Sequence, residues 1–258
     1  MTAASALEAS EIRVSFGGVQ AVDGVSLSVE PGSVVGVIGP NGSGKTSLLN
    51  ALTGVVAATG ELAVDGKRAR LGRPRALRRA GLVRTFQAPQ VVSDMTCLDN
   101  VLLSPVDRRG TGVASAWLAR PWMQRAERNR AAHAAEAMEL VGLADKRELF
   151  ASALTYGQAR LLDLARAITG EPRVLMLDEP SAGLNEAETE FLADLLRTLR
   201  SRGTAILLVD HKVDFVDSLC QRLVVLQLGG VIANGSPREV WADARVRDAY
   251  LGVADAQG

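Results

Sequence analysis

The fold of this chain is decided by the stretch Gly39-Pro40-Asn41-Gly42-Ser43-Gly44-Lys45-Thr46, which fits the pattern G-x-x-x-x-G-K-[ST]. An apolar run over 34–38 precedes it and predicts a buried strand, and residues 47–52 after it predict a helix. Glycines let successive backbone N–H groups turn towards a polyphosphate, and the helix N-terminus contributes the positive end of its dipole. A Gly-rich turn in an ordinary α/β protein is the alternative, but the strand–loop–helix setting favours a nucleotide site.

The loop supplies candidate ligands for both phosphate groups and a metal ion. Lys45 is placed to reach the β- and γ-phosphates, and the Thr46 hydroxyl is placed to ligate Mg²⁺. The residues expected to contact the nucleotide are Gly39, Pro40, Asn41, Gly42, Ser43, Gly44, Lys45, Thr46 and Ser47. These residue types at this spacing predict a nucleoside triphosphate with Mg²⁺ as the ligand.

Composition limits the remaining function classes. The 258 residues carry 29 basic and 29 acidic side chains, and zero net charge argues against a nucleic-acid protein that works by bulk charge. Apolar residues form only short runs, none near the roughly 18 consecutive residues that a membrane-spanning helix requires. The first basic residue is Arg13, so no charged segment precedes a signal-like stretch. We expect a cytoplasmic chain that reaches a membrane only through a partner.

Two further features concern cysteine and arginine. Cys97 and Cys220 lie far apart without metal-ligand spacing, which predicts reduced, structural thiols. Basic residues are concentrated between 67 and 84, at Lys67, Arg68, Arg70, Arg73, Arg75, Arg78, Arg79 and Arg84. A solvated helix face is the favoured interpretation of this run, and contact with anionic headgroups at a membrane surface is the alternative.

The order of predicted elements indicates an α/β chain with a helical insertion. Short alternating strands are expected over 11–16, 25–29 and 61–64. Residues 124–141 are rich in Ala, Glu and Arg. Their apolar positions recur at helical spacing, at Ala126, Ala134, Ala137, Met138 and Val141. Near Gln158 the α/β pattern returns.

The C-terminal part alternates helices and strands. One helix is expected with an apolar face of Leu161, Leu164, Ala165 and Ile168, before a strand over 174–177. Asn185 and Glu188 form a cap for the next helix, whose apolar stripe is Leu192, Leu195, Leu196 and Leu199. A strand over 205–209, a hairpin at Gly229-Gly230 and a cap at Ser236 with Glu239 follow.

A second motif places two carboxylates at the end of a predicted buried strand, in the segment Leu175-Met176-Leu177-Asp178-Glu179-Pro180. Ligands of parallel α/β sheets bind at the carboxyl edge of the strands, so this pair and the phosphate loop are expected at one site. Asp178 would hold Mg²⁺ through water, and Glu179 would orient or deprotonate the attacking water. An ordinary acidic strand end is the alternative, which the complete phosphate loop makes less favoured. His211 follows the strand over 205–209, at the same edge.

Taken together, these motifs resemble those of the ATP-binding-cassette (ABC) ATPases. Leu154-Thr155-Tyr156-Gly157-Gln158 resembles the family's signature motif, and Phe86-Gln87 resembles its Q-loop. The segment Ser181-Ala182-Gly183-Leu184-Asn185 resembles the family's D-loop. His211 matches its switch histidine, and Phe16 matches the aromatic residue that stacks on adenine. The chain departs from the usual pattern at Thr155, which keeps a hydroxyl, at Tyr156 in place of Gly, and at Asn185 in place of Asp.

The resemblance implies a fold and a set of site residues. The fold is α/β, a P-loop NTPase of ABC type within one domain, 1–258. It has a RecA-like core with an N-terminal antiparallel β subdomain, about 1–90 and 159–258, and a helical subdomain, about 91–158. The implied catalytic residues are Glu179, His211, Gln87 and Lys45; Phe16 stacks on the adenine of ATP, and Mg²⁺ is held by Thr46, Gln87 and Asp178. Thr155, Tyr156, Gly157 and Gln158 would complete the ATP site of a second subunit.

A finer resemblance is to the ATPase subunits of branched-chain, or hydrophobic, amino-acid importers. It is carried by Phe16-Gly17-Gly18, Val83-Arg84-Thr85-Phe86-Gln87, Tyr156-Gly157-Gln158, Ser181-Ala182-Gly183-Leu184-Asn185 and Ala249-Tyr250-Leu251-Gly252. Urea and amide importers share much of this pattern, and they remain the alternative. The resemblance implies a second ATPase subunit, two permease subunits, an extracytoplasmic solute-binding protein acting indirectly, and no nucleic acid. It places the chain at the cytoplasmic face of the inner membrane, bound through the permeases.

Two other classes fit the sequence less well. Soluble cassette ATPases that act on ribosomes usually carry two cassettes in one chain, and those of DNA repair carry long coiled-coil insertions; neither feature is found in this sequence. A P-loop kinase or GTPase would lack the signature-like motif, and the guanine-specific sequence Asn-Lys-x-Asp does not occur in the chain. A transport ATPase is therefore the favoured hypothesis.

Overall fold

The structure, a computed structural model, describes residues 5–104 and 120–254, with the side chains of 120–127 and 251–254 left out. The chain divides into two compact units. Unit 1 comprises residues 1–87 and 173–258, and unit 2 comprises residues 88–172. In the described part of the chain, no helix combines the length and apolar character that crossing a membrane would require.

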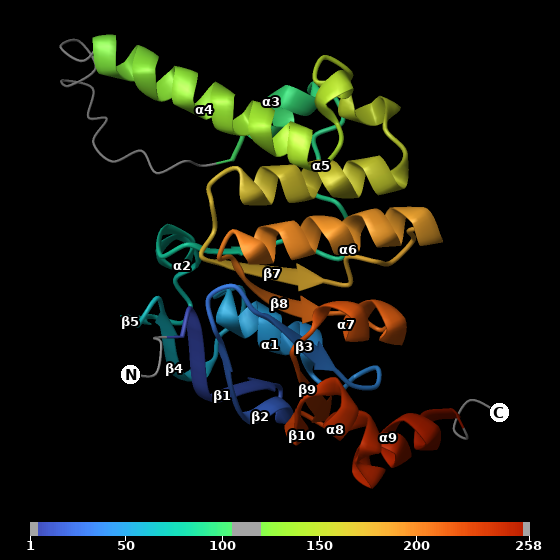
Figure 1. Cartoon of the computed structure of the whole chain (residues 1–258). Coiled ribbons are helices and arrows are strands. Elements are labelled where there is room, and N and C mark those ends of the chain that lie inside the picture. Colours follow the sequence, from blue (N-terminus) through green and yellow to red (C-terminus); the bar gives the residue numbers. More distant parts are fainter. Residues whose placement is uncertain (1–4, 105–119, 255–258) are drawn as a thin grey trace. The chain divides into compact units, whose positions relative to one another are not determined.

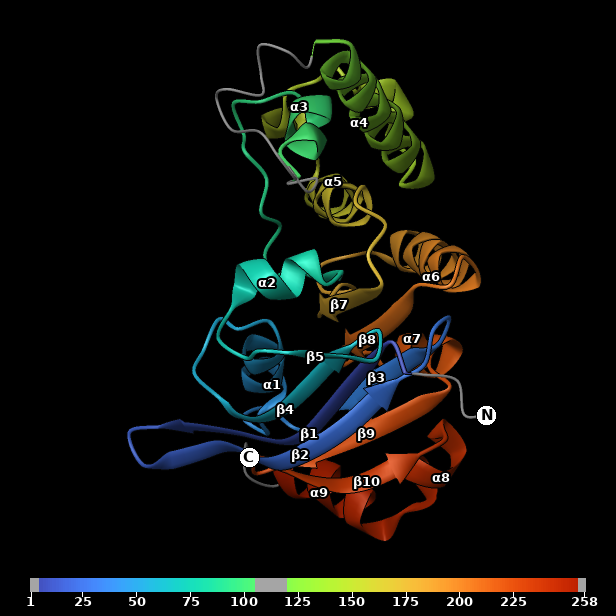
Figure 2. The same cartoon turned by 90° about the vertical axis from the view of Figure 1, so that its left-hand side faces the viewer.

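The first sheet of unit 1 is antiparallel and has the strand order β2-β1-β4-β5 (Figure 2). Its strands are β1 (Leu7–Phe16), β2 (Val19–Val29), β4 (Thr59–Val64) and β5 (Lys67–Ala69). Apolar residues alternate along β1, where Leu7, Ala9, Ile12 and Val14 are buried. The expectation of an N-terminal antiparallel β region is confirmed.

The second sheet of unit 1 carries the phosphate loop and has the order β10-β9-β3-β8-β7-β6. Figure 1 labels the strands from β10 to β7. Its strands are β3 (Val34–Ile38), β6 (Leu82–Arg84), β7 (Val174–Asp178), β8 (Ala205–Val209), β9 (Arg222–Gln227) and β10 (Gly230–Gly235). Neighbouring strands are parallel from β9 to β6, and β10 joins β9 in an antiparallel hairpin. The carboxyl ends of β3, β7 and β8 therefore lie at one edge of this sheet, where ligands of such sheets bind.

Helices cover both faces of the parallel strands. Figure 2 shows α1 (Lys45–Leu52) on one side of the sheet and α6 (Glu186–Ser201) and α7 (Val213–Leu219) on the other. The strands β3, β7 and β8 are buried throughout, as expected for parallel strands covered on both faces. Alternate strand residues pack with α1 and the first sheet in one hydrophobic core, among them Val35, Val37, Val174, Met176, Leu207 and Val209.

Capping residues in the sequence set the starts of two helices of unit 1. Asn185 caps α6 and Ser236 caps α8 (Pro237–Ala242), each in a reciprocal capping box with the residue three positions later. The predicted stripe of α6 is buried at Leu192, Leu195, Leu196 and Leu199. The last helix is α9 (Ala244–Ala254).

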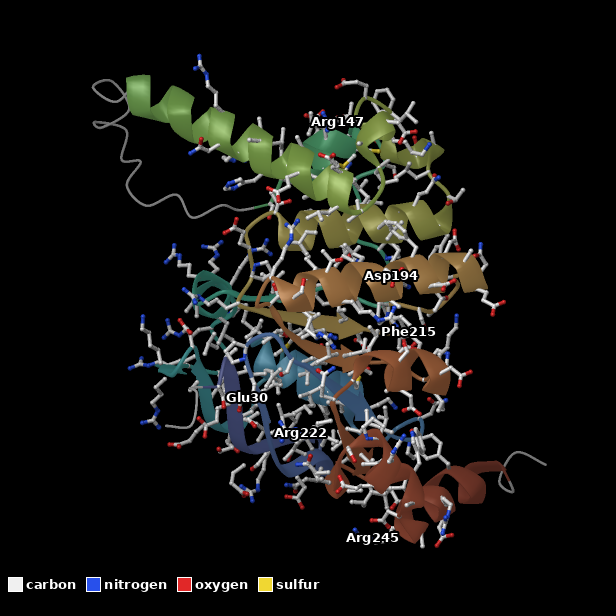
Figure 3. The ribbon with its side chains drawn as sticks, viewed as in Figure 1. Glu30, Arg147, Asp194, Phe215, Arg222 and Arg245 are labelled. Carbon is white, nitrogen blue, oxygen red and sulfur yellow. The ribbon has the colours of Figure 1, made fainter. Side chains whose placement is uncertain are left out.

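Arg222, labelled in Figure 3, begins β9 and donates hydrogen bonds to the carbonyl and hydroxyl of Ser28 on β2, which ties the two sheets together.

Unit 2 is helical. Its helices are α3 (Cys97–Leu102), α4 (Arg120–Leu140) and α5 (Tyr156–Ile168), and two short 3₁₀ turns cover Ala144–Lys146 and Ala151–Ala153. The three helices pack on one another. On α4 the predicted positions Ala134, Ala137 and Met138 are buried, as is Val141 just after it, whereas Ala126 lies outside the described side chains. Residues 105–119, within the expected helical subdomain, also lie outside the described residues.

The unit boundaries differ from those expected at about 91 and 158. Unit 2 ends at Pro172 because α5 packs against α3 and α4, so this helix belongs with the helical unit. The predicted apolar face of α5 is buried at Leu164, Ala165 and Ile168, whereas Leu161 is only partly buried and Leu162 is buried as well. The reason is that tertiary packing covers more of the helix than the stripe read from its periodicity.

Two compositional expectations can be compared with the structure. Cys97 and Cys220 are buried and free, and burial raises the pKa of the Cys220 thiol to about 12, so it stays protonated and inert. Seven of the eight basic residues between 67 and 84 are exposed, on β5, on α2 (Pro74–Arg79) or beside them. Arg84 does not belong to this exposed face, because its side chain is buried at the end of β6.

Candidate functional site

The phosphate loop connects β3 to α1, as predicted. Two of its glycines are required by close backbone approach and positive φ. A Cβ at Gly39 (φ 149°) would lie 2.1 Å from the carbonyl oxygen of Leu226, and one at Gly44 (φ 104°) would lie 2.3 Å from that of Ala21. Only glycine fits at these two positions, since the nearby atoms belong to the backbone and cannot move aside cheaply.

Lys45 begins α1 and folds over the loop. Its Nζ donates hydrogen bonds to the carbonyl oxygens of Gly39 at 2.7 Å and Pro40 at 2.9 Å. Burial lowers the pKa of Lys45, and the charges of Glu179 and Asp178 oppose that shift. The charges of Asp178, the last residue of β7, and of Glu179, the next residue, therefore act on the Lys45 ammonium group.

Asp178 ends β7 and is held by a buried arginine. Arg84 Nη2 lies 2.7 Å from Asp178 Oδ2, and the two side chains are only 4% and 5% exposed. Arg84 Nη1 also donates to Asn50 Oδ1 on α1 at 2.6 Å, and its guanidinium lies 5.0 Å from the centre of the Phe86 ring. One side chain thus joins the Asp178 carboxylate to α1 and to the segment that leads to Gln87. A buried charge needs such a partner.

Sequence reasoning missed this role of Arg84 and counted it with the exposed basic run. The available signal was its place directly after Leu82 and Val83, the two apolar residues of β6. In the sheet Arg84 lies opposite Met176 of β7, two residues before Asp178.

Glu179 has a left-handed backbone conformation, with φ 48°. For a residue other than glycine this costs about 1–3 kcal/mol, and it persists only where neighbouring groups fix it. The Glu179 N–H donates to the Val209 carbonyl at 2.7 Å, and its Oε2 accepts from Gln87 Nε2 at 2.8 Å. The structure thus brings together two predicted catalytic residues, Glu179 and Gln87.

His211 follows β8, beside Asp210. Its imidazole is largely exposed, with Nδ1 3.9 Å from Asp210 Oδ1. Phe16 ends β1 and is 49% exposed, so its ring is available for stacking. The adenine-stacking role of Phe16 and the switch role of His211 stay predictions.

The C-terminal helix α9 reaches the phosphate loop, a contact that the sequence did not reveal. Burial raises the pKa of Tyr250, and the backbone of Gly39 opposes that rise. Tyr250 packs edge-on against Trp241, with ring centroids 5.8 Å apart, and Trp241 donates to Asp217 at 2.9 Å. Trp241 of α8 and Tyr250 of α9 therefore pack together, and Tyr250 lies near the start of the phosphate loop.

The signature-like segment opens α5 in unit 2. Thr155 is the N-cap residue: its Oγ1 accepts from the Gln158 N–H at 3.2 Å, and Gln158 Oε1 accepts from the Thr155 N–H at 3.2 Å. Tyr156 is 49% exposed, and its hydroxyl accepts a hydrogen bond from Arg160 at 2.7 Å. The hydroxyl that Thr155 retains at this position therefore has a defined local role as a helix cap.

The predicted magnesium ligands are of the chemical type that this ion needs. Among residues 5–104 and 120–254, no group of three or more His, Cys, Asp or Glu side chains could hold a metal ion alone. Mg²⁺ at nucleotide sites takes one or two carboxylates together with substrate phosphates and water, and needs no larger cluster. The sequence predicts Thr46, Gln87 and Asp178 as the protein donors, and their hydroxyl, amide and carboxylate oxygens are ligands of the type that Mg²⁺ takes.

Comparison with known proteins agrees with this geometry. A family model described as "ABC transporter" matches residues 22–182, and one described as "Branched-chain amino acid ATP-binding cassette transporter" matches residues 231–256. The high-affinity branched-chain amino acid transport ATP-binding protein BraF of Pseudomonas aeruginosa is 39% identical over 250 residues, 96% of this chain and 98% of that protein. The protein LivG of Salmonella typhimurium, of the same description, is 39% identical over 245 residues, 94% and 96% of the two chains.

A solved structure extends the likeness to three dimensions. The ADP conformation of an ATP-binding cassette of an ABC transporter is similar to this chain with a TM-score of 0.82 and 30% sequence identity. The similarity covers 96% of this chain and 99% of that one. The expected fold class is confirmed, as is the resemblance read from the motifs. The chain belongs to the ABC transporter family and is an ATP-binding subunit whose ATPase activity is coupled to transport.

Proposed function

We propose that this chain is the ATP-hydrolysing subunit of an importer of branched-chain amino acids. The observation that carries the proposal is the match of residues 231–256 to the branched-chain amino acid family model. The names of BraF and LivG, similar over nearly their whole length, give independent support. An importer of urea or amides is the alternative for the solute.

In the proposed reaction, the loop amides and Lys45 bind the phosphates of ATP, and Phe16 stacks on its adenine. Glu179 takes the proton of the water that attacks the γ-phosphate, while Gln87 and His211 contact that phosphate or its water. Mg²⁺, held by Thr46, Gln87 and Asp178, supplies positive charge to the phosphate oxygens when it is bound. The contact of Gln87 with Glu179 supports this division of roles.

The proposed partners are a second ATPase subunit and two permeases. Thr155, Tyr156, Gly157 and Gln158 are proposed to complete the ATP site of the second subunit, which is a different chain or a second copy. The solute-binding protein would act on the permeases alone, and no nucleic acid is involved. The subunit would then lie at the cytoplasmic face of the membrane, bound through the permeases.

One segment of unit 2 is suited to contact a permease. Val92 is exposed on the loop before α3, and this loop is fixed by the buried side chain of Asn100. Asn100 Oδ1 accepts from the Val92 N–H at 2.7 Å, and Asn100 Nδ2 donates to the carbonyls of Val92 at 3.0 Å and Thr96 at 2.9 Å. A rigid loop that presents an apolar side chain loses little entropy on binding a partner.

The proposal is tested by ATP hydrolysis in the assembled complex. We expect the isolated chain to hydrolyse ATP weakly, and the partner ATPase and permeases in lipid to raise the rate. Gly157→Asp, which places a carboxylate at the start of α5, should reduce that rate, because it would repel the phosphates bound by the partner subunit. A full rate for the isolated chain, or an unaffected rate for Gly157→Asp in the complex, would contradict the composite site.

A further inference from the structure

The strands β7 and β8 end in two adjoining loops that are joined by one buried carboxylate. Asp178 pairs with Val209 in the parallel register, so the loops after these residues begin side by side. The first carries Glu179 and the second carries His211. Asp210 stands between Val209 and His211, and its side chain is completely buried, with 0% exposure.

The Asp210 carboxylate accepts four hydrogen bonds from the two loops. From the first loop it accepts the Ser181 N–H at 3.0 Å and the Ser181 hydroxyl at 2.7 Å. From its own loop it accepts the N–H groups of His211 at 2.8 Å and Lys212 at 3.1 Å. A fully buried carboxylate is costly unless its oxygens are hydrogen-bonded, and these donors satisfy both of them.

The same two loops are tied a second time by Lys212. Its Nζ donates to the Leu184 carbonyl at 3.2 Å and to the Thr189 hydroxyl at 3.2 Å. Leu184 lies in the segment after Ser181, and Thr189 lies in the first turns of α6. Asp210 and Lys212 therefore anchor the beginning and the end of the 181–185 loop to the loop that carries His211.

These hydrogen bonds hold the backbone of Glu179 in an unfavourable conformation. Glu179, two residues before Ser181, has the left-handed φ of 48°. Such a conformation in a residue other than glycine is kept only when the surroundings determine it. The Glu179 N–H bonded to Val209 and the Ser181 groups bonded to Asp210 supply that constraint, on either side of Pro180.

We propose that Asp210 is the positioning residue that holds Glu179 and His211 in their working geometry at the adjoining ends of β7 and β8. It acts through these two residues and does not contact ATP. The inference rests on the proposed roles of Glu179 and His211 in hydrolysis. Since an error of about 1 Å in the placement of a reacting group can cost about 100-fold in rate, the effect should be large.

The test replaces Asp210 by Asn and separates kcat from the KM for ATP. Asn keeps the size of the side chain, but its amide nitrogen cannot accept a hydrogen bond. At least one of the four hydrogen bonds that the Asp210 carboxylate accepts is therefore lost. We expect kcat to fall about 10- to 100-fold and the KM for ATP to stay within about twofold, since the phosphate loop is unchanged. Asp194→Asn is the matched control: its carboxylate also accepts a hydrogen bond, from Arg197 at 2.7 Å, but on the exposed face of α6, and its kcat should equal that of the wild type.

A double-mutant cycle distinguishes positioning from general damage to the fold. In Glu179→Gln and His211→Ala backgrounds, measured by single-turnover hydrolysis, Asp210→Asn should cost less than about threefold, because the groups it positions are already disabled. A similar 10- to 100-fold loss in both backgrounds would overturn the proposal, as would a wild-type kcat for Asp210→Asn. Wild-type activity of the two background variants themselves would instead overturn the proposed roles of Glu179 and His211.

Ser181→Ala keeps the test decisive if Asp210→Asn does not fold. This change removes one hydroxyl donor and leaves the Ser181 amide bonded to Asp210. We expect kcat to fall about two- to fivefold with ATP affinity unchanged, and the loss to vanish in the Glu179→Gln background. An unchanged kcat, or a loss that persists in that background, would contradict the proposal.

Discussion

Glu179→Gln is expected to lower steady-state ATP turnover about 10²- to 10⁴-fold while ATP binding is retained. Glutamine preserves the side-chain shape and an acceptor for the Gln87 amide, which lies 2.8 Å from Glu179 Oε2, but it cannot take a proton from water. ATP should therefore bind and remain unhydrolysed, and an ATP-bound dimer should accumulate. Single-turnover hydrolysis and size-exclusion chromatography with ATP measure the two effects.

Glu8→Gln is the control for this change, since Glu8 is an exposed residue on β1. Its turnover should equal that of the wild type. Unchanged steady-state turnover in Glu179→Gln would place the base elsewhere and would contradict the proposed role of this residue.

Lys45→Ala is expected to abolish turnover and to weaken ATP binding about 10- to 100-fold. Hydrogen bonds to a charged group are worth about 1.5–3 kcal/mol, and this variant loses those between the ammonium and the phosphates. The fold should survive, because the hydrogen bonds that Lys45 Nζ makes in the described structure go to the carbonyls of Gly39 and Pro40, both within the phosphate loop itself. Isothermal titration with ATP measures the affinity, and circular dichroism checks the fold.

Lys67→Ala provides the matched control, because Lys67 is exposed on β5 and outside the phosphate loop. It should bind and hydrolyse ATP as the wild type does. Wild-type hydrolysis by Lys45→Ala would show that the loop does not bind the reacting phosphates in the proposed manner.

The parts of the fold that depend on local signals could be predicted from the sequence. The strand, loop and helix around Gly39 to Thr46 follow from glycine spacing and apolar runs. The caps at Asn185 and Ser236 follow from a polar residue with Glu three positions later, and both boxes are formed. Each of these features is encoded within a few neighbouring residues, so no tertiary contact is needed to recognise it.

Contacts between distant segments could not be predicted in the same way. Arg84 was counted with an exposed basic run, yet β6 places it beside β7, where it pairs with Asp178, 94 residues along the chain. Asp210 and Ser181 are 29 residues apart and meet only because β7 and β8 are neighbours. The direction of these side chains depends on strand order and register, which a single sequence does not specify.

Tertiary packing also decides which residues of α5 are buried. Periodicity placed four residues on the buried face, and three of them, Leu164, Ala165 and Ile168, are buried. Leu161 is only partly buried and its neighbour Leu162 is buried, because α3 and α4 both pack on this helix. A helix that contacts two others buries a wider face than a single stripe describes. Most of the buried face of α5 could therefore be predicted from periodicity, but its width could not.

The measurement that tests the central claim most directly is ATP-driven uptake of labelled leucine into proteoliposomes. The vesicles would contain this subunit, its partner ATPase and the permeases, with the solute-binding protein supplied on the uptake side and urea compared as solute. We predict leucine accumulation that requires ATP and falls to background when this subunit carries Glu179→Gln. Accumulation of urea in place of leucine, or leucine uptake that Glu179→Gln leaves unchanged, would contradict the account.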